Sequence, residues 1–341
     1  MEKDKDITVK GTFRVNYSLP KNFKKEDYKL FHNDLEKHFS PTSLVSLKDV
    51  NITPDGIVFK GLRIFKEFLI WPQHSGEFNV FYLFRNYLRR KKRHINTEVI
   101  VCFDYWSSGY FHWLCDFLPR LFIAAEFEYH NAVLLPDSLK SPFVESSLKA
   151  FGVSNIIRFS KEDYVHCEKA IIPEYVTPSG DTNPEVMLKI RAKLIQFYFE
   201  QISNKIGARN IYVSRAKTKG RFVTNEEEVI KVLTNYNFEI IFFEDYSFVE
   251  QMALCYHAQN LIGIHGANLT NILFMQLNSN VMELRRSDDN INNYYFKLAT
   301  GVKLNYYYQL CSPTNISNDQ TFDLTVNIGL LEQNVKRMLG N

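Results

Sequence analysis

The second half of the chain alternates short runs of β-forming residues with segments that carry helix-start signals, and this alternation constrains the fold more than any other feature. The β-rich runs are residues 211–214, 239–243, 261–264 and 281–284. Capping boxes, in which a Ser or Thr is followed three residues later by Glu, predict helices that start at Thr224 and Ser247. Short strands that alternate with longer helices indicate βαβ units and a parallel sheet.

The first half predicts a second α/β domain with additional strands before it. Residues 98–103, 132–135 and 156–159 are β-rich, residues 111–127 have helical spacing, and residues 50–70 alternate as strands or a hairpin do. Pro184, after Asp181–Asn183, starts a long helix. The 341 residues are enough for two domains. We predict an N-terminal domain at 1–183, a linking helix at 184–206, a second domain at 207–320 and a C-terminal helix at 321–341.

Composition and charge argue against several classes of protein. The net charge of +3 is too small to indicate a nucleic-acid partner. No apolar run reaches the roughly 18 residues of a membrane-spanning helix, and the initial MEKDKDITVKG lacks the apolar stretch of a secretory signal. The five cysteines, with no CxxC pair, predict reduced and buried thiols. With a composition rich in Asn, Lys and Ile, these features predict a bacterial cytoplasmic protein.

Polar residues follow the predicted strands of the second half. They are Ser214-Arg215, Glu244-Asp245, His265-Gly266 and Glu283-Leu284-Arg285. The carboxyl ends of parallel strands lie at one edge of a sheet, where α/β proteins bind ligands. We therefore expect these residues to converge on one site.

Two of these segments are typical of a phosphate site. The loop RAKTKGR holds Arg215, Lys217, Lys219 and Arg221, and arginine can bind a diphosphate through two parallel hydrogen bonds. Gly266 precedes a predicted helix from about residue 268, and the N-terminus of a helix favours anions. Each feature alone is also typical of a solvated loop or a simple turn. Their expected position on one edge favours the phosphate site.

Acidic residues at the same edge leave alternatives open. Glu283 could accept hydrogen bonds from ribose hydroxyls, or could pair with Arg285 or Arg286. Glu244 and Asp245 could bind a metal ion or a sugar hydroxyl, or could simply begin a loop.

His112 and Asp116, in the segment YFHWLCDFLPRLF, are candidates for catalysis. They are four residues apart and therefore share one face of the predicted helix. The helix follows the strand EVIVCF, so the pair lies at the carboxyl end of a strand, where it could take a proton from a hydroxyl. The alternative is a structural hydrogen bond that fixes the start of the helix.

Residues 80–94 combine the aromatic segment VFYLFRNYL with the basic run RRKKRH. Aromatic residues beside basic ones are typical of contact with an anionic membrane surface or a lipid-linked acceptor. A solvated loop tip is the alternative.

Several motifs are absent from the sequence: GxxxxGKS/T, HExxH, GxSxG and GxGxxG. The only Asp-x-Asp is Asp4-Lys5-Asp6, near the N-terminus. A catalyst that depends on metal-binding carboxylates therefore has no good candidate.

The segments FHWLCDFLPRL, IYVSR with the following NEEEV, EQMALCYHAQNLIGIHGANLTNILF and VMEL together resemble glycosyltransferase family 61. The resemblance covers roughly residues 100–285 and is most specific around HGA. That family includes bacterial surface-polysaccharide transferases and eukaryotic enzymes that add xylose or N-acetylglucosamine. It is similar to GT-B enzymes, in which two Rossmann-like domains face an interdomain cleft. The resemblance implies inversion at the anomeric carbon, usually from a UDP-sugar, with no cofactor and no metal ion.

The resemblance also implies roles for individual residues. The implied donor-binding residues are Arg215, Arg221, His265, Gly266, Ala267, Asn268, Thr270, Asn271 and Glu283. The two arginines would hold the diphosphate, and Glu283 would lie near the ribose. His112 and Asp116 match the family's His-x-x-x-Asp positions, with Asp116 as the base assisted by His112. The family often has glycine where this chain has Asn268; asparagine tolerates left-handed backbone angles, so we expect the turn to form.

We therefore expect a metal-independent, inverting glycosyltransferase of capsule or lipopolysaccharide biosynthesis. Its partners would be a nucleotide sugar and a glycan or lipid-linked acceptor, and Glu244 and Asp245 would contact the acceptor or the donor sugar. It would be cytoplasmic, or peripheral at the inner face of the membrane through residues 80–94. Two alternatives stay open: a nucleotide-sugar epimerase or hydrolase on the same fold, and a non-catalytic module that binds nucleotide sugars or glycans.

Overall fold

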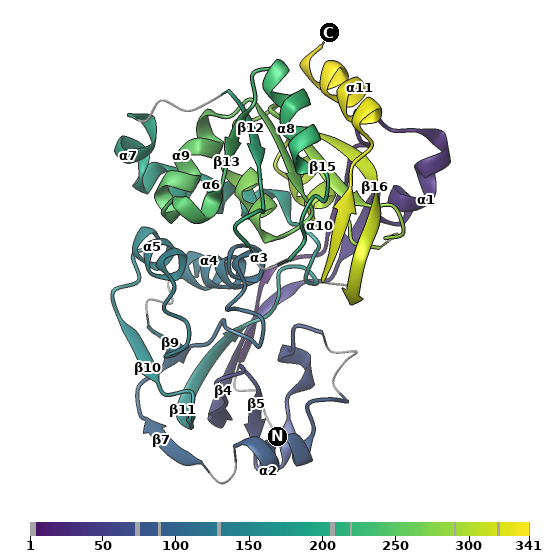
Figure 1. Ribbon diagram of the computed structural model, residues 1–341. Coiled ribbons are helices and arrows are strands. Elements are labelled where there is room, and N and C mark those ends of the chain that lie inside the picture. The colour runs from purple at the N-terminus through teal and green to yellow at the C-terminus, as the bar shows by residue number, and fades with distance from the viewer. Residues whose placement is uncertain are drawn as a thin grey trace. The chain divides into compact units, whose positions relative to one another are not determined.

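The computed structural model divides into two compact units, which Figure 1 shows coloured by position in the sequence. The first unit contains Met1–Arg14 and His38–Val186, and the second contains Val15–Lys37 and Met187–Asn341. The structure describes residues 5–71, 76–87, 90–127, 131–204, 209–218, 220–289, 291–318 and 321–340. No helix in these ranges is both long enough and apolar enough to cross a lipid bilayer.

A mixed sheet forms the centre of the first unit. Its described strands are β1 (Lys5–Lys10), β4 (Thr42–Ile52), β5 (Val58–Lys60), β6 (Arg63–Ile64), β7 (Lys91–Ile95), β8 (Val99–Ile100), β9 (Ala132–Pro136), β10 (Ile156–Phe159) and β11 (Asp163–Pro173). They follow the order β10-β9-β8-β11-β4-β5-β6, with β1 on β4 and β7 on β11. The strands from β10 to β11 are parallel, whereas β4 is antiparallel to β11 and β5. The predicted α/β character is confirmed, although the long strand β11 was not predicted.

The helices of the first unit include the predicted helix at 111–127, which consists of three consecutive pieces. The described helices are η3 (Lys66–Phe68), α2 (Val80–Asn86), α3 (Tyr110–His112), η5 (Trp113–Phe117), α4 (Leu118–Glu126) and α5 (Pro142–Ala150). The piece η5 is a π-helix. Pro119 explains its wide turn, because proline donates no hydrogen bond and its ring would collide with the carbonyl of Cys115 in a regular α-helix.

A mainly parallel sheet forms the centre of the second unit (Figure 1). Its described strands are β12 (Asn210–Val213), β13 (Glu239–Ile241), β14 (Asn260–Ile264), β15 (Asn280–Arg286), β16 (Asn305–Asn318) and β17 (Thr321–Thr325), in the order β13-β12-β14-β15-β16-β17. The first five in this order are parallel, and β17 is antiparallel to β16. The predicted parallel sheet is confirmed, and the carboxyl ends of its strands lie at one edge.

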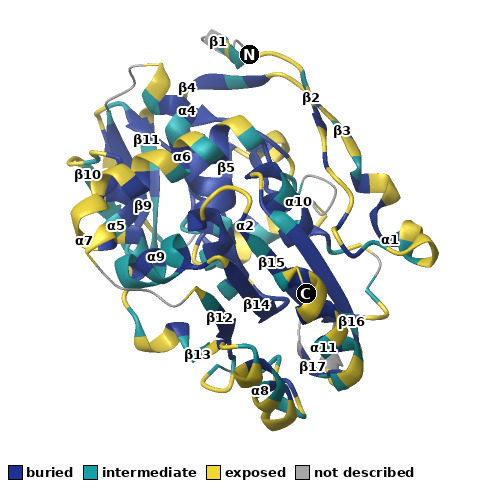
Figure 2. Cartoon of the chain, turned by 90° about the horizontal axis from the view of Figure 1, so that it is seen from above, coloured by how far each residue is buried: buried dark blue, intermediate teal, exposed yellow. Residues whose placement is uncertain are grey.

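Helices cover this sheet and close its core. They are η1 (Lys25–Asp27), α1 (Tyr28–Phe31), η2 (His32–Asp34), α6 (Pro184–Phe197), α7 (Phe199–Ser203), α8 (Glu226–Asn235), η6 (Phe243–Asp245), α9 (Phe248–His257), η7 (Ala267–Phe274), α10 (Tyr294–Gly301) and α11 (Ile328–Leu339). Ile262 and Met282 of the sheet lie in one buried cluster with Val229 and Leu233 of α8 and Val335 of α11. Each fully buried aliphatic side chain contributes about 1.5–3 kcal/mol. Figure 2 shows β14 and β15 largely dark blue and much of α8 yellow.

Two helix starts were predicted from capping boxes, and one prediction is confirmed. Ser247 and Glu250 form the reciprocal box at the start of α9. Thr224 does not cap α8; the N-cap residue is Asn225, whose side chain makes no capping bond. The hydroxyl of Thr224 instead lies 2.7 Å from that of Thr325. The prediction at Thr224 was wrong because a contact with a distant strand replaced a local one.

Three segments differ from the sequence-based boundaries. The helix from Pro184 ends at Phe197, and α7 is a separate helix. The C-terminal segment starts with the strand β17 and only then becomes helical. Val15–Lys37 lies in the second unit, where the side chain of Asn22 hydrogen-bonds the backbone of Tyr308 at 2.7 and 3.1 Å.

The prediction that the cysteines are reduced and buried is confirmed. Cys102, Cys115, Cys167, Cys255 and Cys311 are all free and buried. Burial raises the pKa of the Cys102 thiol to about 12, so it stays protonated and unreactive at neutral pH.

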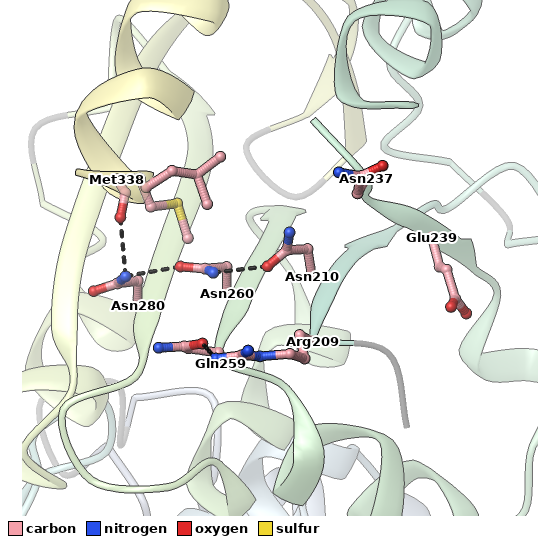
Figure 3. A pocket seen from close by; sticks show the side chains of 9 residues that line it. Arg209, Asn210, Asn237, Glu239, Gln259, Asn260, Asn280 and Met338 are labelled. Carbon is pink, nitrogen blue, oxygen red and sulfur yellow. Dashed lines mark hydrogen bonds between the residues drawn. The ribbon is translucent and has the colours of Figure 1, made fainter. Parts of the chain in front are cut away.

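A ladder of asparagine side chains crosses the amino edge of the second-unit sheet (Figure 3). Asn260 donates to Asn210 at 2.7 Å, Asn280 donates to Asn260 at 2.7 Å, and Asn305 donates to Asn280 at 3.0 Å. These residues are register partners on neighbouring strands. Asn280 also donates to the carbonyl of Met338, which ties α11 to the sheet. Asn210, Asn260 and Asn280 of the ladder line a pocket of about 450 Å³.

Candidate functional site

Two arginines meet at the carboxyl edge of the second-unit sheet. Arg215 follows β12, and Arg221 lies at the end of the same loop. A side-chain carbon added at Gly266, after β14, would lie 2.8 Å from Nη1 of Arg215 and 3.3 Å from Nη1 of Arg221. Arg221 Nη1 also donates to the carbonyl oxygen of His265 at 3.4 Å. Gly266 therefore allows both guanidinium groups to approach the backbone of the turn.

These guanidinium groups are positive charges that are largely removed from water. Burial, followed by repulsion from Arg221, lowers the pKa of Arg215, and burial also lowers the pKa of Arg221. The Nε atom of Arg215 is buried and has no hydrogen-bond partner. Buried polar groups are normally paired. An anion with several acceptor oxygens would satisfy the free donor and offset the repulsion.

A buried carboxylate holds His265 in place beside this pair. Glu283 is fully buried; one of its oxygens contacts Nδ1 of His265, and the other accepts from the hydroxyl of Tyr306 at 2.5 Å. Burial opposes ionisation of Glu283, but the charge of His265, their hydrogen bond and the charge of Arg285 together hold its pKa below the usual value. The ionised carboxylate fixes a hydrogen on Nδ1 of His265.

The other predicted donor residues lie on the same edge but differ in exposure. Ala267 is exposed, Asn268 is half-buried, and Thr270 is buried with a hydroxyl that lacks a partner. Asn271 donates to Gln251 at 3.0 Å, so its amide is used within the protein. Asn268 is not among the described residues with positive φ, so the turn requires no left-handed backbone at this position.

The carboxylates of Glu244 and Asp245, which follow β13, both contact neighbouring side chains. Glu244 accepts a 3.3 Å hydrogen bond from Asn268, and Asp245 forms an ion pair with the partly exposed Lys217. The remaining lysine of the basic loop, Lys219, lies outside the described residues. Among the described residues, no group of three or more His, Cys, Asp or Glu side chains is arranged to hold a metal ion.

The structure brings His112 and Asp116 together in the first unit. Nδ1 of His112 lies 2.7 Å from Oδ2 of Asp116, and the hydroxyl of Ser179 donates to the same oxygen at 2.8 Å. The side chain of Asp116 is 2 % exposed and that of His112 is 17 % exposed. His112 is therefore the member of the pair that solvent or a substrate reaches more readily.

Burial and charge affect Asp116 in opposite directions. Burial raises its pKa, the hydrogen bond and charge of His112 oppose this, and the nearby Asp104 adds to the rise. The net direction follows burial, which is the largest of these effects.

Ser179 and Tyr306 are site residues that the sequence analysis missed. Ser179 is 63 positions from Asp116 and Tyr306 is 23 positions from Glu283, so no local pattern links them. Arg120 did leave a signal, because an arginine in the apolar run FLPRLF indicates a buried charge with partners. Its guanidinium donates to the carbonyls of Pro173 at 2.7 Å and Cys102 at 2.6 Å.

The second unit thus brings two arginines together at a strand-end turn, and the first unit holds a histidine–carboxylate pair. A family model described as Glycosyltransferase 61 matches residues 110–282, half of the chain, and the chain belongs to this family of glycosyltransferases. A shorter stretch is 36 % identical over 84 residues to the EGF domain-specific O-linked N-acetylglucosamine transferase of Drosophila melanogaster. That match covers 24 % of this chain and 16 % of the relative.

The lowered pKa of Glu283 predicts a pH-dependent contribution to stability. Because its pKa in the folded state is below the unfolded value of about 4.5, the contribution is full above that pH and is lost as the pH falls through the folded value. At pH 7, Glu283→Gln should lower the free energy of unfolding by about 1.5–3 kcal/mol. The difference from wild type should shrink at acidic pH, as measured by urea unfolding at pH 7 and pH 4.

Glu239→Gln is the matched control, because Glu239 is exposed on β13 of the same sheet. It should change stability little at either pH. An equal loss at both pH values in Glu283→Gln would show that the carboxylate's charge is not what stabilises the site.

Proposed function

We propose that this glycosyltransferase uses a nucleotide sugar, preferably a UDP-sugar, and transfers the sugar with inversion and without a metal ion. The observation that carries the proposal is the half-buried arginine pair at Gly266, with a buried, unpartnered Nε on Arg215. A leaving diphosphate gains negative charge in the transition state. Positioned guanidinium groups can stabilise that charge in the role that a metal ion plays elsewhere.

The proposed reaction joins the chemistry of both units. The acceptor oxygen attacks the anomeric carbon from the face opposite the diphosphate, while its proton passes to Nε2 of His112. The bond from the anomeric carbon to the diphosphate oxygen breaks, and the nucleoside diphosphate leaves toward Arg215 and Arg221. A GT-B arrangement is part of this proposal, and it is supported by the division of the required groups between two α/β units.

We assign the base to His112 and the positioning role to Asp116. The sequence analysis gave the base to Asp116. The contact between Nδ1 of His112 and Asp116 leaves Nε2 for the acceptor and orients the ring, and Asp116 is nearly inaccessible. A buried carboxylate that holds a histidine also stabilises the imidazolium formed on proton transfer.

The biological setting is the least direct part of the proposal. A role in surface-polysaccharide biosynthesis, in capsule or lipopolysaccharide and on the cytoplasmic side of the membrane, is supported by the sequence resemblance and composition. The matched stretch of the Drosophila melanogaster relative supports N-acetylglucosamine as one donor sugar to test. Glu283 as a ribose contact would require one of its two internal partners, His265 or Tyr306, to be displaced.

The donor site predicts selective stabilisation by one nucleotide. A thermal-shift panel of UDP, GDP, CMP, TDP and UDP-sugars, with and without EDTA, should show one nucleotide class that stabilises the protein in EDTA. A ligand at a hundred times its dissociation constant adds about 2.7 kcal/mol. Arg215→Ala should weaken binding roughly ten- to a hundredfold, the equivalent of losing one charged hydrogen bond.

Gly266→Ala should have a similar effect, because the added methyl would displace the guanidinium of Arg215. Arg337→Ala, on the exposed side of α11, is the control and should bind as wild type does. Without ligand, Arg215→Ala should be at least as stable as wild type, since it removes a repulsion. Loss of the shift in EDTA would contradict metal independence, and no shift with any nucleotide would contradict the donor site.

The assignment of the base predicts an order of effects on turnover. His112→Ala should lower kcat by about 10²–10⁴, and Asp116→Asn should lower it less, while the nucleotide-induced thermal shift is unchanged in both. Transfer from the radiolabelled nucleotide sugar gives the rates. A larger loss of kcat in Asp116→Asn than in His112→Ala would show that Asp116 is the base. Unchanged transfer in both variants would remove this pair from the mechanism, and release of sugar without an acceptor would indicate a hydrolase.

A peripheral membrane contact through residues 80–94 is also part of the proposal. Phe81 and Phe84 on α2 are 84 % and 53 % exposed, and Lys91 and Arg93 on β7 are exposed. Leu88 and Arg89 lie outside the described residues. Phe81→Ser should reduce co-sedimentation with phosphatidylserine vesicles, and Phe199→Ser, at another exposed site, should not. Equal binding by both variants would show that Phe81 makes no membrane contact; the alternative of a solvated loop tip does not fit residues 91–95, which form the strand β7.

A further inference from the structure

Two tryptophan rings enclose the ring of His112. The ring centroids of Trp71 and Trp106 lie 6.0 and 5.6 Å from that of His112, and 5.4 Å from each other. Both tryptophans are partly exposed, and the neighbouring Tyr105 is 52 % exposed. Large aromatic surface is thus left open to solvent beside the proposed base. Tryptophan is usually highly buried, so this exposure calls for an explanation.

The turn that carries Trp106 is fixed by buried polar contacts. One oxygen of Asp104 accepts from the backbone N–H of Trp106 at 2.7 Å, and the other accepts from the hydroxyl of Tyr175 at 2.8 Å. The guanidinium of Arg120 lies 4.4 Å from the centroid of the Tyr175 ring. Gly109 closes the turn by donating to the carbonyl of Trp106 at 2.8 Å. Trp106 is therefore preorganised, which lowers the entropic cost of binding against it.

We propose that Trp71 and Trp106 form the acceptor subsite, and that the acceptor group bound there is a pyranose ring. This inference rests on the proposed function. The C–H bonds on one face of a pyranose carry partial positive charge and pack on the negative face of an aromatic ring. The hydroxyls around the edge of the sugar then point away from the tryptophans, and one of them reaches His112.

The arrangement fits a pyranose better than a peptide or a lipid chain. Two aromatic rings at 65° to each other offer a small, angled apolar surface. A lipid chain would gain most from a longer apolar groove, and an extended peptide would need a row of backbone partners. The polar groups that contact His112 among the described residues are the carboxylate of Asp116 and the hydroxyl of Ser179, both at Nδ1, and they do not form such a row.

Tryptophan fluorescence tests the subsite in the wild-type protein. The chain has three tryptophans, and Trp113 is fully buried, stacked on Phe117 and hydrogen-bonded to Ser147. A response to added sugar therefore reports Trp71 and Trp106. Titration with methyl pyranosides of glucose, galactose, mannose and N-acetylglucosamine should give a saturable change with at least one. No response to any of them, or a response only to a serine peptide or to detergent micelles, would overturn the inference.

Transfer kinetics test the role of the ring itself. Trp106→Ala should raise the acceptor KM about tenfold or more, and Trp106→Phe should recover most of the loss because it restores an aromatic face. Phe197→Ala, at an exposed aromatic of α6 in the other unit, is the control and should leave KM unchanged. The nucleotide-induced thermal shift should be the same in all variants. If the wild-type protein shows the nucleotide-induced thermal shift but Trp106→Ala keeps the wild-type acceptor KM, the acceptor subsite is wrong and the proposed function stands. If the wild-type protein shows no nucleotide-induced shift, the proposed function itself is wrong.

Discussion

The site of the second unit depends on keeping two positive charges side by side with little water. The guanidinium groups of Arg215 and Arg221 meet at Gly266 because that residue has no side chain to separate them. Their lowered pKa values show the free-energy cost of this arrangement in the absence of a ligand. The rest of the fold supplies the stability that this cost requires, which is a common compromise at functional sites. An anionic ligand then gains both a free donor and relief of repulsion.

The histidine–carboxylate contacts at the two candidate sites have opposite electrostatic outcomes. Glu283 has Tyr306 and Arg285 as well as His265, so its partners outweigh burial and it stays ionised. Glu283 therefore holds the ring of His265 in one orientation. For Asp116, burial is the largest effect and the contacts with His112 offset it only in part, so its pKa rises. Under the proposed function, Asp116 would orient a histidine that changes charge during the reaction, whereas Glu283 would hold His265 in one orientation.

The sequence predicted what is determined locally. The parallel strands, the box at Ser247 and the pairing of His112 with Asp116 follow from spacings of a few residues. Contacts between distant segments could not be predicted this way. Ser179 reaches Asp116 from a loop 63 residues away, and Thr325 draws Thr224 away from the helix it was expected to cap. The roles of the site residues stay predictions, because proximity shows which groups meet and not what they bind.

The two edges of the second-unit sheet show why unsatisfied atoms are a better guide to function than hollow space. The amino edge lines a pocket of about 450 Å³, but Asn210, Asn260 and Asn280 use their amides on one another and on α11. A ligand there would have to compete with a completed network. At the carboxyl edge, Nε of Arg215 and the hydroxyl of Thr270 are buried without partners. A ligand with acceptor oxygens at this edge would make hydrogen bonds that the described residues leave unmade.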